Sequence, residues 1–440
     1  MTIIEFKKND SPLGQILKLG DDAIVISLGN QKITIKNIIE LMSKLIFSNM
    51  YSSNTIQIPL LEYLEKDVIE AQIKCFYIFQ HKPLNFKTNK DLENRKFELI
   101  HSESLEIKNL IKKNKTIVKF LNEIKDLIEL PPELIYPESL LKYILDFSER
   151  NKLNVLKIYD EQQLSKEGFG GILSVGKGSH NPPKMAILEW NGTNNKNEKP
   201  IVLVGKGVTY DSGGYSIKTD PYMKNMKRDK TGVCIILGLM GILAKLNMNI
   251  RVIAILPMAE NVISSKSYKP DEIIHSYSKK TIEVYNTDAE GRLLLMDGIT
   301  LGLEYEPKII IDVATLTAVG TFCGHYGAIF SNNNDIAWQL QKSGEKVGER
   351  FWVLPLFDEL IEDAQDTKMA NVKNDGYQCY STTTMGAAFL ANFVKNDIPW
   401  IHIDLGESQS MYEKYNKKNI NTTNSFLMIL EFLSNFNQLY

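Results

Sequence analysis

Histidine and cysteine are scarce in this sequence, which limits the kinds of site it can build. Six histidines and four cysteines occur among 440 residues, without an HExxH motif, a paired histidine spacing or a CxxC. These absences weigh against a histidine-rich zinc site and against a disulfide framework. We expect Cys75, Cys234, Cys323 and Cys379 to be reduced core residues. Any metal site should be built on oxygen, which suits Mn²⁺ or Mg²⁺ and tolerates Zn²⁺.

The sequence also lacks a charge excess and a long apolar run. Lys and Arg number 51 and Asp and Glu 53, giving a net charge of -2. That balance offers no bulk attraction for nucleic acid or an anionic membrane. The longest apolar run, GVCIILGLMGILA, is 13 residues long, whereas a membrane-spanning helix needs about 20. Because the first ten residues, MTIIEFKKND, show no signal peptide, we expect a cytoplasmic protein without membrane or nucleic-acid partners.

What is present is an ordinary globular composition, 43% hydrophobic and 24% charged, long enough for two or three domains. In residues 1–115, the predicted strands DAIVISL and NTIQIPL alternate with the helical patterns IKNIIELMSKLIF and EKDVIEAQIKCFYIF. This alternation predicts a small N-terminal α/β domain. A charged helical stretch over residues 98–130, ended by the pair Pro131-Pro132, is expected to lead into a second domain.

Residues 116–440 repeat the order strand, loop, helix, with the linking helix at their start. The expected strands are KMAILEW, PIVLVG, IRVIAILPM, KTIEVY and KIIIDVATLT. Near-continuous apolar strands between helical patterns are typical of a sheet covered on both faces. The sequence therefore predicts an α/β catalytic domain with a mainly parallel central sheet flanked by helices. In such sheets, sites lie at the carboxyl ends of the strands.

Two segments follow predicted strand ends and are rich in charge, VGKGVTYDSGGYSIKTDPYMKNMKRDKTG and YNTDAEGRLLL. Together they bring four acidic and three basic side chains to these ends: Asp211, Asp229, Asp288, Glu290, Lys206, Lys218 and Arg292. In the second segment the charges alternate, so in an extended chain they would point to one side. A solvated strand edge is one interpretation. The other is a pair of divalent ions, about 3.5–4 Å apart, that offsets the repulsion between the carboxylates.

Of three further features, Lys206 favours the metal interpretation, whereas a basic segment and His402 have structural interpretations. Lys206 directly follows a buried strand, so it must be paired or lose its proton, and a neutral amine can bind a metal. MKNMKRDK, residues 223–230, is predicted to be a solvated basic loop, because it lacks the interleaved aromatics of a nucleic-acid patch. His402 alternates with apolar residues in WIHIDL and is expected to be a core histidine with satisfied hydrogen bonds.

The motifs NTDAEGRLLL, GKGVTYDSGGYSIK and MKRDKTG resemble, in order and spacing, those of the leucyl aminopeptidase family, peptidase family M17. Further similar segments, among them DVATLTAV and WIHIDL, extend the resemblance over about residues 120–410. The GGYSIK form and the short N-terminal domain look most like the bacterial aminopeptidase B branch. The family consists of two-metal cytosolic aminopeptidases.

The resemblance implies an enzyme that hydrolyses the N-terminal peptide bond of short peptides with two divalent ions per chain, Mn²⁺ or Zn²⁺. One ion would be held by Lys206, Asp211, Asp229 and Glu290. The other would be held by Asp211, Asp288 and Glu290. Water bridging two such ions loses its proton near neutral pH and becomes the nucleophile.

The resemblance also assigns roles to the remaining site residues. Lys218 would stabilise the oxyanion, and Arg292 would hold a bicarbonate ion as general base. Met226, Thr315 and Ala318 would line the substrate pocket. A homohexamer is implied as well.

Two departures from the family pattern, Lys230-Thr231 and the IDLGES segment, lie near the predicted pocket and leave the specificity open. The intact ligand positions speak against an inactive scaffold. The alternative of a DNA-binding accessory protein on an aminopeptidase scaffold is weakened by the neutral charge.

Overall fold

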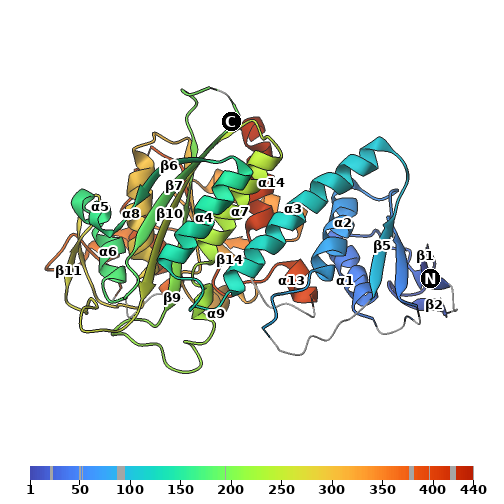
Figure 1. Ribbon diagram of the computed structural model, residues 1–440, viewed down its shortest axis with the longest axis horizontal. Helices are drawn as coiled ribbons and strands as arrows, with labels where there is room; N and C mark the ends of the chain where they lie inside the picture. The colour runs from blue at the N-terminus through green and yellow to red at the C-terminus, as the bar shows by residue number, and fades with distance from the viewer. Residues whose placement is uncertain are drawn as a thin grey trace.

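Two sheets lie side by side in the computed structural model, joined by one long helix (Figure 1). The structure describes residues 1–19, 23–48, 51, 53–86, 95–193, 195–375, 381–395, 397–416 and 423–439. Within these residues, no helix has both the length and the apolar character needed to cross a membrane. Cys75, Cys234 and Cys323 are free and buried, as predicted, and Cys379 falls outside the described residues.

The N-terminal unit is a five-stranded sheet in the order β2-β3-β1-β4-β5. Its strands are β1 Thr2–Lys7, β2 Ile16–Leu19, β3 Ala23–Ser27, β4 Thr55–Pro59 and β5 Lys96–Ile100. All neighbours are parallel except β2 and β3. The helices α1 Ile35–Ile46 and α2 Lys66–Gln80 occupy the predicted positions. The helical prediction from residue 98 is wrong at its start, because β5 continues to Ile100.

The linking helix α3 runs from Leu105 to Glu129 and stops before the two prolines. It packs against α2 at one side and against α7 (Thr231–Lys245) at the other. One hydrophobic cluster extends without a break from Phe79 through Ile124 to Ile235. The predicted domain boundary between residues 115 and 116 falls inside this helix and stays a prediction.

The central sheet has nine strands in the order β15-β14-β17-β13-β8-β10-β7-β6, with β9 also beside β10. They are β6 Asn154–Tyr159, β7 Lys184–Asn191, β8 Ile201–Gly205, β9 Gly207–Asp211, β10 Arg251–Asn261, β13 Ile309–Ala314, β14 Gly327–Ser331, β15 Phe351–Val353 and β17 Trp400–Asp404. Five neighbouring pairs are parallel and three antiparallel. The predicted α/β class with a mainly parallel central sheet is therefore confirmed.

Helices cover both faces of this sheet, because successive strand residues point to opposite sides. Leu203 packs in one cluster with α4 (Pro137–Asn151), α7, α10 (Asn334–Val347) and α14 (Phe426–Leu439). Val202 and Val204 pack in the other, with α5 (Glu161–Glu167), α6 (Gly170–Gly176), α8 (Gly291–Leu303) and α12 (Thr382–Ala391). The short helices α9 Gly320–Cys323, α11 Asp358–Gln365 and α13 Met411–Tyr415 complete the larger unit.

The segment KTIEVY lies outside the central sheet, contrary to prediction. Its strand β12, Thr281–Glu283, belongs to a three-stranded sheet with β11 Ile273–His275 and β16 Val372–Lys373. The chain leaves the extended conformation after Glu283 and becomes helical at Gly291. Asp288, Glu290 and Arg292 therefore do not alternate along a strand, and the argument from extended geometry was wrong even though it picked these residues.

Candidate functional site

The site lies where several strands of the central sheet end, as predicted. Lys206 directly follows β8, Asp211 ends β9, Asn261 ends β10 and Thr315 directly follows β13. Glu290 directly precedes α8 and approaches from the neighbouring loop. Parallel strands thus deliver residues far apart in the sequence to one edge of the sheet.

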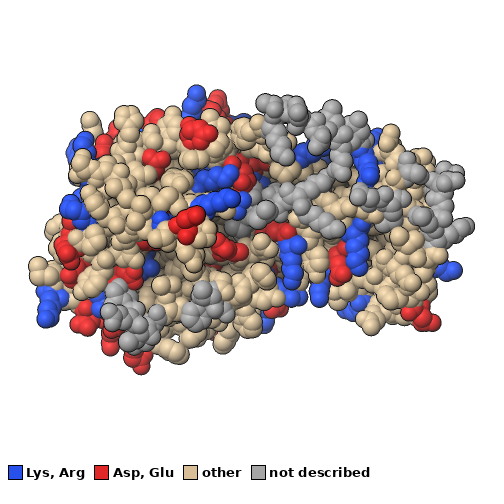
Figure 2. Space-filling model, turned by 90° about the horizontal axis from the view of Figure 1, so that it is seen from below, with Lys and Arg blue, Asp and Glu red and all other residues tan. Residues whose placement is uncertain are grey.

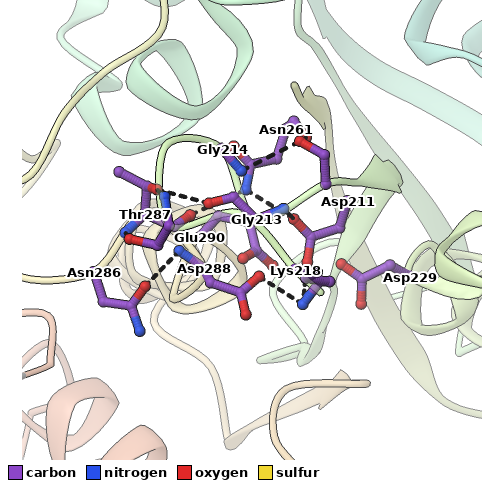
Figure 3. A network of polar contacts seen from close by, with 12 residues as sticks. Asp211, Gly213, Gly214, Lys218, Asp229, Asn261, Asn286, Thr287, Asp288 and Glu290 are labelled. Carbon is purple, nitrogen blue, oxygen red and sulfur yellow. Dashed lines mark hydrogen bonds and ion pairs between the residues drawn. The ribbon is translucent and has the colours of Figure 1, made fainter. Parts of the chain in front are cut away.

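Three carboxylates converge there. Asp211, Asp288 and Glu290 each offer an oxygen, and these oxygens all lie within 4.8 Å of one another. Figure 3 shows them facing a common space, with Asp229 beside them and the Lys218 amine between. Asp211 and Glu290 are only 2% and 1% exposed. We use the name site cluster for these four acids and two lysines: Asp211, Asp229, Asp288, Glu290, Lys206 and Lys218.

Two lysines hold the acids together. The Lys206 amine lies 2.8 Å from Asp229 Oδ1 and 2.8 Å from Glu290 Oε1, and donates to the Thr315 carbonyl. The Lys218 amine lies 2.9 Å from Asp211 Oδ2 and 2.5 Å from Asp288 Oδ1. Lys206 is thus paired, one of the two possibilities for a lysine at this position. Burial lowers the pKa of Lys206, but the surrounding carboxylates outweigh it and raise that pKa.

The acids repel one another despite these lysines. Burial, with Glu290 and Asp211 nearby, raises the pKa of Asp229 to about 8. Burial and the same kind of repulsion raise the pKa of Asp288 to about 7. A cation of higher charge would relieve this repulsion.

The donor set fits such a cation. Among the described residues, Asp229 Oδ2 and Glu290 Oε2 are buried oxygens without a hydrogen-bond partner. Converging carboxylate oxygens are the ligands that Mn²⁺ and Mg²⁺ prefer, and Zn²⁺ accepts them. The residues present therefore suit a divalent metal site.

A glycine turn and an asparagine orient Asp211. Asp211 Oδ1 accepts from the Gly213 amide at 2.9 Å and from Asn261 Nδ2 at 2.8 Å. Gly213 has φ 85° and Gly214 has φ 63°, a region that side chains disfavour. A Cβ on Gly214 would also meet Asn261 Oδ1 and Thr287 Oγ1 at 3.0 Å. The Gly-Gly pair lies within one of the two charged segments that the sequence indicated, whereas Asn261 lies outside both.

Asn374 organises the loop before α8, and sequence reasoning missed it. This fully buried side chain accepts from the amides of Tyr285, at 2.8 Å, and Asn286, at 3.2 Å. The backbone carbonyl of Asn374 accepts from Arg292 Nη1, and the Asn286 side chain accepts from the Asp288 amide. Asn374 is 82 residues from Arg292, so no local pattern could have indicated the link.

The predicted pocket residues lie in different surroundings. The Thr315 hydroxyl donates to Asp229 Oδ1 at 2.8 Å, so this residue borders the acids. Met226 begins the short 3-10 helix η1, Met226–Arg228, just before Asp229, and is half-buried. Ala318 is exposed on the loop that follows β13. Their roles as pocket residues stay predictions.

The prediction of a solvated basic loop over residues 223–230 holds for Lys224 and Asn225, which are exposed, and is wrong for the end of the segment. Lys230 is fully buried. Lys227 and Arg228 form ion pairs with Glu129 at 3.0 and 2.6 Å. The segment instead folds against the end of α3, because that end presents carbonyl and carboxylate oxygens.

His402 is a core histidine, but only one of its nitrogens is satisfied. Nδ1 pairs with Asp312 Oδ1 at 2.5 Å, and Trp400 donates to the other oxygen of Asp312 at 2.7 Å. Nε2 is buried without a hydrogen-bond partner among the described residues. The prediction of a fully satisfied side chain was thus correct for Nδ1 alone.

Comparison with known proteins gives a consistent result. The family model "Cytosol aminopeptidase family, catalytic domain" matches residues 122–429. Proteins named "Probable cytosol aminopeptidase" from Syntrophotalea carbinolica and Aquifex aeolicus are 41% identical over 283 residues and 35% identical over 369 residues. These alignments cover 64% and 82% of this chain. They cover 56% and 73% of the two relatives, so this chain spans little more than half of the first.

A solved structure shares the fold across the whole chain. It is titled "Bottromycin maturation enzyme BotP in complex with Mn", and its TM-score is 0.86 at 21% identity, with 99% of both chains covered. The aminopeptidase B branch stays a prediction. The family match, the identity to the two relatives and the order of the motifs lead to one conclusion: this chain belongs to the cytosol aminopeptidase family, peptidase family M17.

Proposed function

We propose that this protein is a metal-dependent aminopeptidase that removes the N-terminal residue of short peptides. The observation that carries the proposal is the site cluster, in which three carboxylate oxygens lie within 4.8 Å and Asp229 Oδ2 is buried without a partner. Membership of the family supplies the reaction class.

Two divalent ions, Mn²⁺ or Zn²⁺, are proposed as cofactors. Lys206, Asp211, Asp229 and Glu290 would hold one, and Asp211, Asp288 and Glu290 the other. When bound, such ions lower the pKa of water and so supply a nucleophile at neutral pH. Because a ligating amine must be neutral, Lys206 has to release its proton when the ion enters.

Lys218 is proposed to stabilise the negative charge that develops on the substrate carbonyl oxygen. Its amine lies within 2.9 Å of two of the site carboxylates, which supports a place for it beside the proposed metal site. A fixed cation in a partly buried site stabilises an oxyanion strongly because water screens it little.

Arg292 is proposed to hold a bicarbonate ion that acts as general base. Arg292 is 4% exposed, and its Nε has no hydrogen-bond partner among the described residues. A planar guanidinium fits a planar carbonate through two parallel hydrogen bonds. The contact with the Asn374 carbonyl fixes one edge of the guanidinium.

Asp229 is proposed to bind the α-amine of the substrate, which selects the end of a peptide over internal bonds. It can do so while holding a metal, because Lys206 and Thr315 approach only Oδ1. Met226, Thr315 and Ala318 would surround the first side chain of the substrate.

A homohexamer in the cytoplasm is proposed as the working assembly. A role in DNA binding is not favoured. The net charge is -2, and on the face shown in Figure 2 basic and acidic side chains are interspersed. Sedimentation of the intact protein tests the assembly, since a stable, active monomer of 50.1 kDa would contradict it.

The function itself is tested with an amino-acid anilide after dialysis against a chelator. Activity should fall to background and return with Mn²⁺ or Zn²⁺. A substrate whose α-amine is acetylated is the control and should not be cleaved. Full turnover in a sample shown by elemental analysis to be metal-free would contradict the two-metal reaction.

A further inference from the structure

Three basic side chains around Asp229 meet the C-terminal end of α3. Lys227 donates to the Glu129 carbonyl at 2.7 Å and pairs with its carboxylate at 3.0 Å. Arg228 Nε donates to the other carboxylate oxygen of Glu129 at 2.6 Å. Lys230 donates to the Ile128 carbonyl at 3.0 Å and to the Lys227 carbonyl at 2.5 Å.

The end of a helix explains why cations gather there. The last carbonyls of α3 have no partner within the helix, and the helix dipole makes this end negative. Lys230 is fully buried, and a buried ammonium group is costly unless it is well paired. Two carbonyl acceptors supply that pairing, Ile128 on α3 and Lys227 within the segment. Moving the segment away from α3 would remove the first of them.

Asp229 lies in the middle of this docked segment. Its side chain belongs to the site cluster, and Lys206 and Thr315 approach its Oδ1 at 2.8 Å. The side chains before and after it are fastened to α3. The backbone of Asp229 is therefore fixed from one side and its carboxylate from the other.

We propose that Lys230, assisted by Lys227 and Arg228, is a positioning residue that sets Asp229 for metal binding by fastening its segment to α3. This inference rests on the proposed metal site. In this proposal α3, the helix that joins the two sheets, helps to support the metal site. Met226, a proposed pocket residue, lies in the 3-10 helix η1 together with Lys227 and Arg228. A shift of this helix should therefore change substrate affinity together with metal affinity.

The principal test is Lys230→Met, which keeps an unbranched side chain, one atom shorter, and removes both hydrogen bonds. Residues that orient metal ligands typically contribute about 10–100-fold to affinity. We expect Mn²⁺ to bind one of its two sites about 10-fold more weakly, with a raised KM and a smaller change in kcat at saturating Mn²⁺. Free Mn²⁺ is measured by its electron paramagnetic resonance signal, without reference to activity.

Lys125→Met is the matched control. Lys125 lies on α3, the helix to which the segment of Lys230 is fastened. It is 2% exposed and has Glu413 as its ionic neighbour at 4.0 Å. This variant should lose stability while its Mn²⁺ affinity stays unchanged. Glu129→Gln is a second, partly exposed variant, and it should weaken Mn²⁺ binding in the same direction, by less.

Each outcome decides between the two proposals. If the wild-type protein binds no Mn²⁺, the proposed function fails. If the wild type binds two ions and Lys230→Met binds them equally well, only the positioning role is overturned. Equal losses in Lys230→Met and Lys125→Met would likewise overturn it, since they would reflect general destabilisation. If Lys230→Met does not fold, Glu129→Gln decides, and unchanged affinity in that variant overturns the inference.

Discussion

Two clusters of buried charge in this molecule have similar composition and different surroundings. The site cluster combines four carboxylates with Lys206 and Lys218. A second group, the α14 cluster, consists of Lys125, Glu349 and Glu413, all at most 4% exposed. The two clusters differ in the groups that bind their carboxylates.

Backbone amides hold the carboxylates of the α14 cluster. Glu349 accepts from the Met428 amide at 2.8 Å, in the first turn of α14. Glu413 accepts from the amides of Ser410, at 2.9 Å, and Thr423, at 2.6 Å. Amides in a folded backbone cannot move aside, so this cluster is closed to a ligand and serves to join the chain segments.

Flexible lysine side chains hold much of the site cluster instead. A lysine amine is carried on a flexible four-carbon chain, so it can move away from a carboxylate when another cation binds there. Asp229 Oδ2 has no hydrogen-bond partner among the described residues. The comparison indicates that buried acids are available for metal when their partners are mobile cations, and structural when their partners are amides.

The largest effect is expected from Lys218→Ala. Because Lys218 is assigned to the transition state, kcat should fall by about 10²–10³ while the metal content stays near two per chain. Elemental analysis and steady-state kinetics measure the two quantities separately. Lys177→Ala, which removes a lysine paired with Glu272 on the surface, should leave kcat nearly unchanged. Loss of metal in Lys218→Ala would place Lys218 among the ligands.

A smaller effect is expected from Asp229→Asn, which keeps the shape and removes the charge. We expect metal affinity to fall at least about 10-fold, the lower bound for residues that merely orient ligands. KM for free-amine substrates should rise as well. The control is Asp297→Asn. Asp297 is a fully buried aspartate that accepts from the Gly171 and Tyr277 amides.

Inhibitors with and without an α-amine separate the two roles of Asp229. They are compared at saturating Mn²⁺, where loss of metal no longer contributes. If the amine adds as much affinity in Asp229→Asn as in the wild type, Asp229 is a metal ligand alone. If Asp297→Asn loses metal equally, the effect belongs to buried aspartates in general.

The sequence predicted the composition of the site better than its geometry. Apolar strands such as IVLVG and the charged residues after them pointed to the correct edge of the sheet. Asp288 and Glu290 were predicted from charges at every second position of an extended chain. The structure does not have this extended segment, because α8 begins at Gly291. Their placement depends on Asn374, and such long-range hydrogen bonds leave no periodic trace in a sequence.

The basic segment shows the same limit. Lysine and arginine are mostly exposed in proteins, so a solvated loop was the natural prediction for residues 223–230. The end of α3 reverses this expectation, because its Ile128 carbonyl accepts from Lys230 and its Glu129 carboxylate pairs with Lys227 and Arg228. Which helix end lies beside a loop is a property of the tertiary fold, and no local pattern expresses it.

The smallest expected effect on the site comes from a change in the α14 cluster, Glu349→Gln. Burial raises the pKa of Glu349 to about 8, whereas a glutamate in the unfolded chain titrates near 4.3. Between these values the folded protein keeps a proton that the unfolded chain releases. Stability from this group is therefore fully present below pH of about 4.3 and is lost as the pH rises towards 8, by at most about 1.36 kcal/mol per pH unit.

Glutamine has no proton to lose, so Glu349→Gln should flatten this decline. Denaturant unfolding of both proteins between pH 5 and 8 measures it, with the chelator present so that metal does not contribute. Mn²⁺ affinity at fixed pH should be the same in both, since Glu349 touches α14 and not the site. An equal slope in the two proteins would mean that amide donors keep Glu349 ionised despite its burial. A fall in Mn²⁺ affinity would instead show that the two clusters are coupled, and the distinction between amide-held and lysine-held acids would fail.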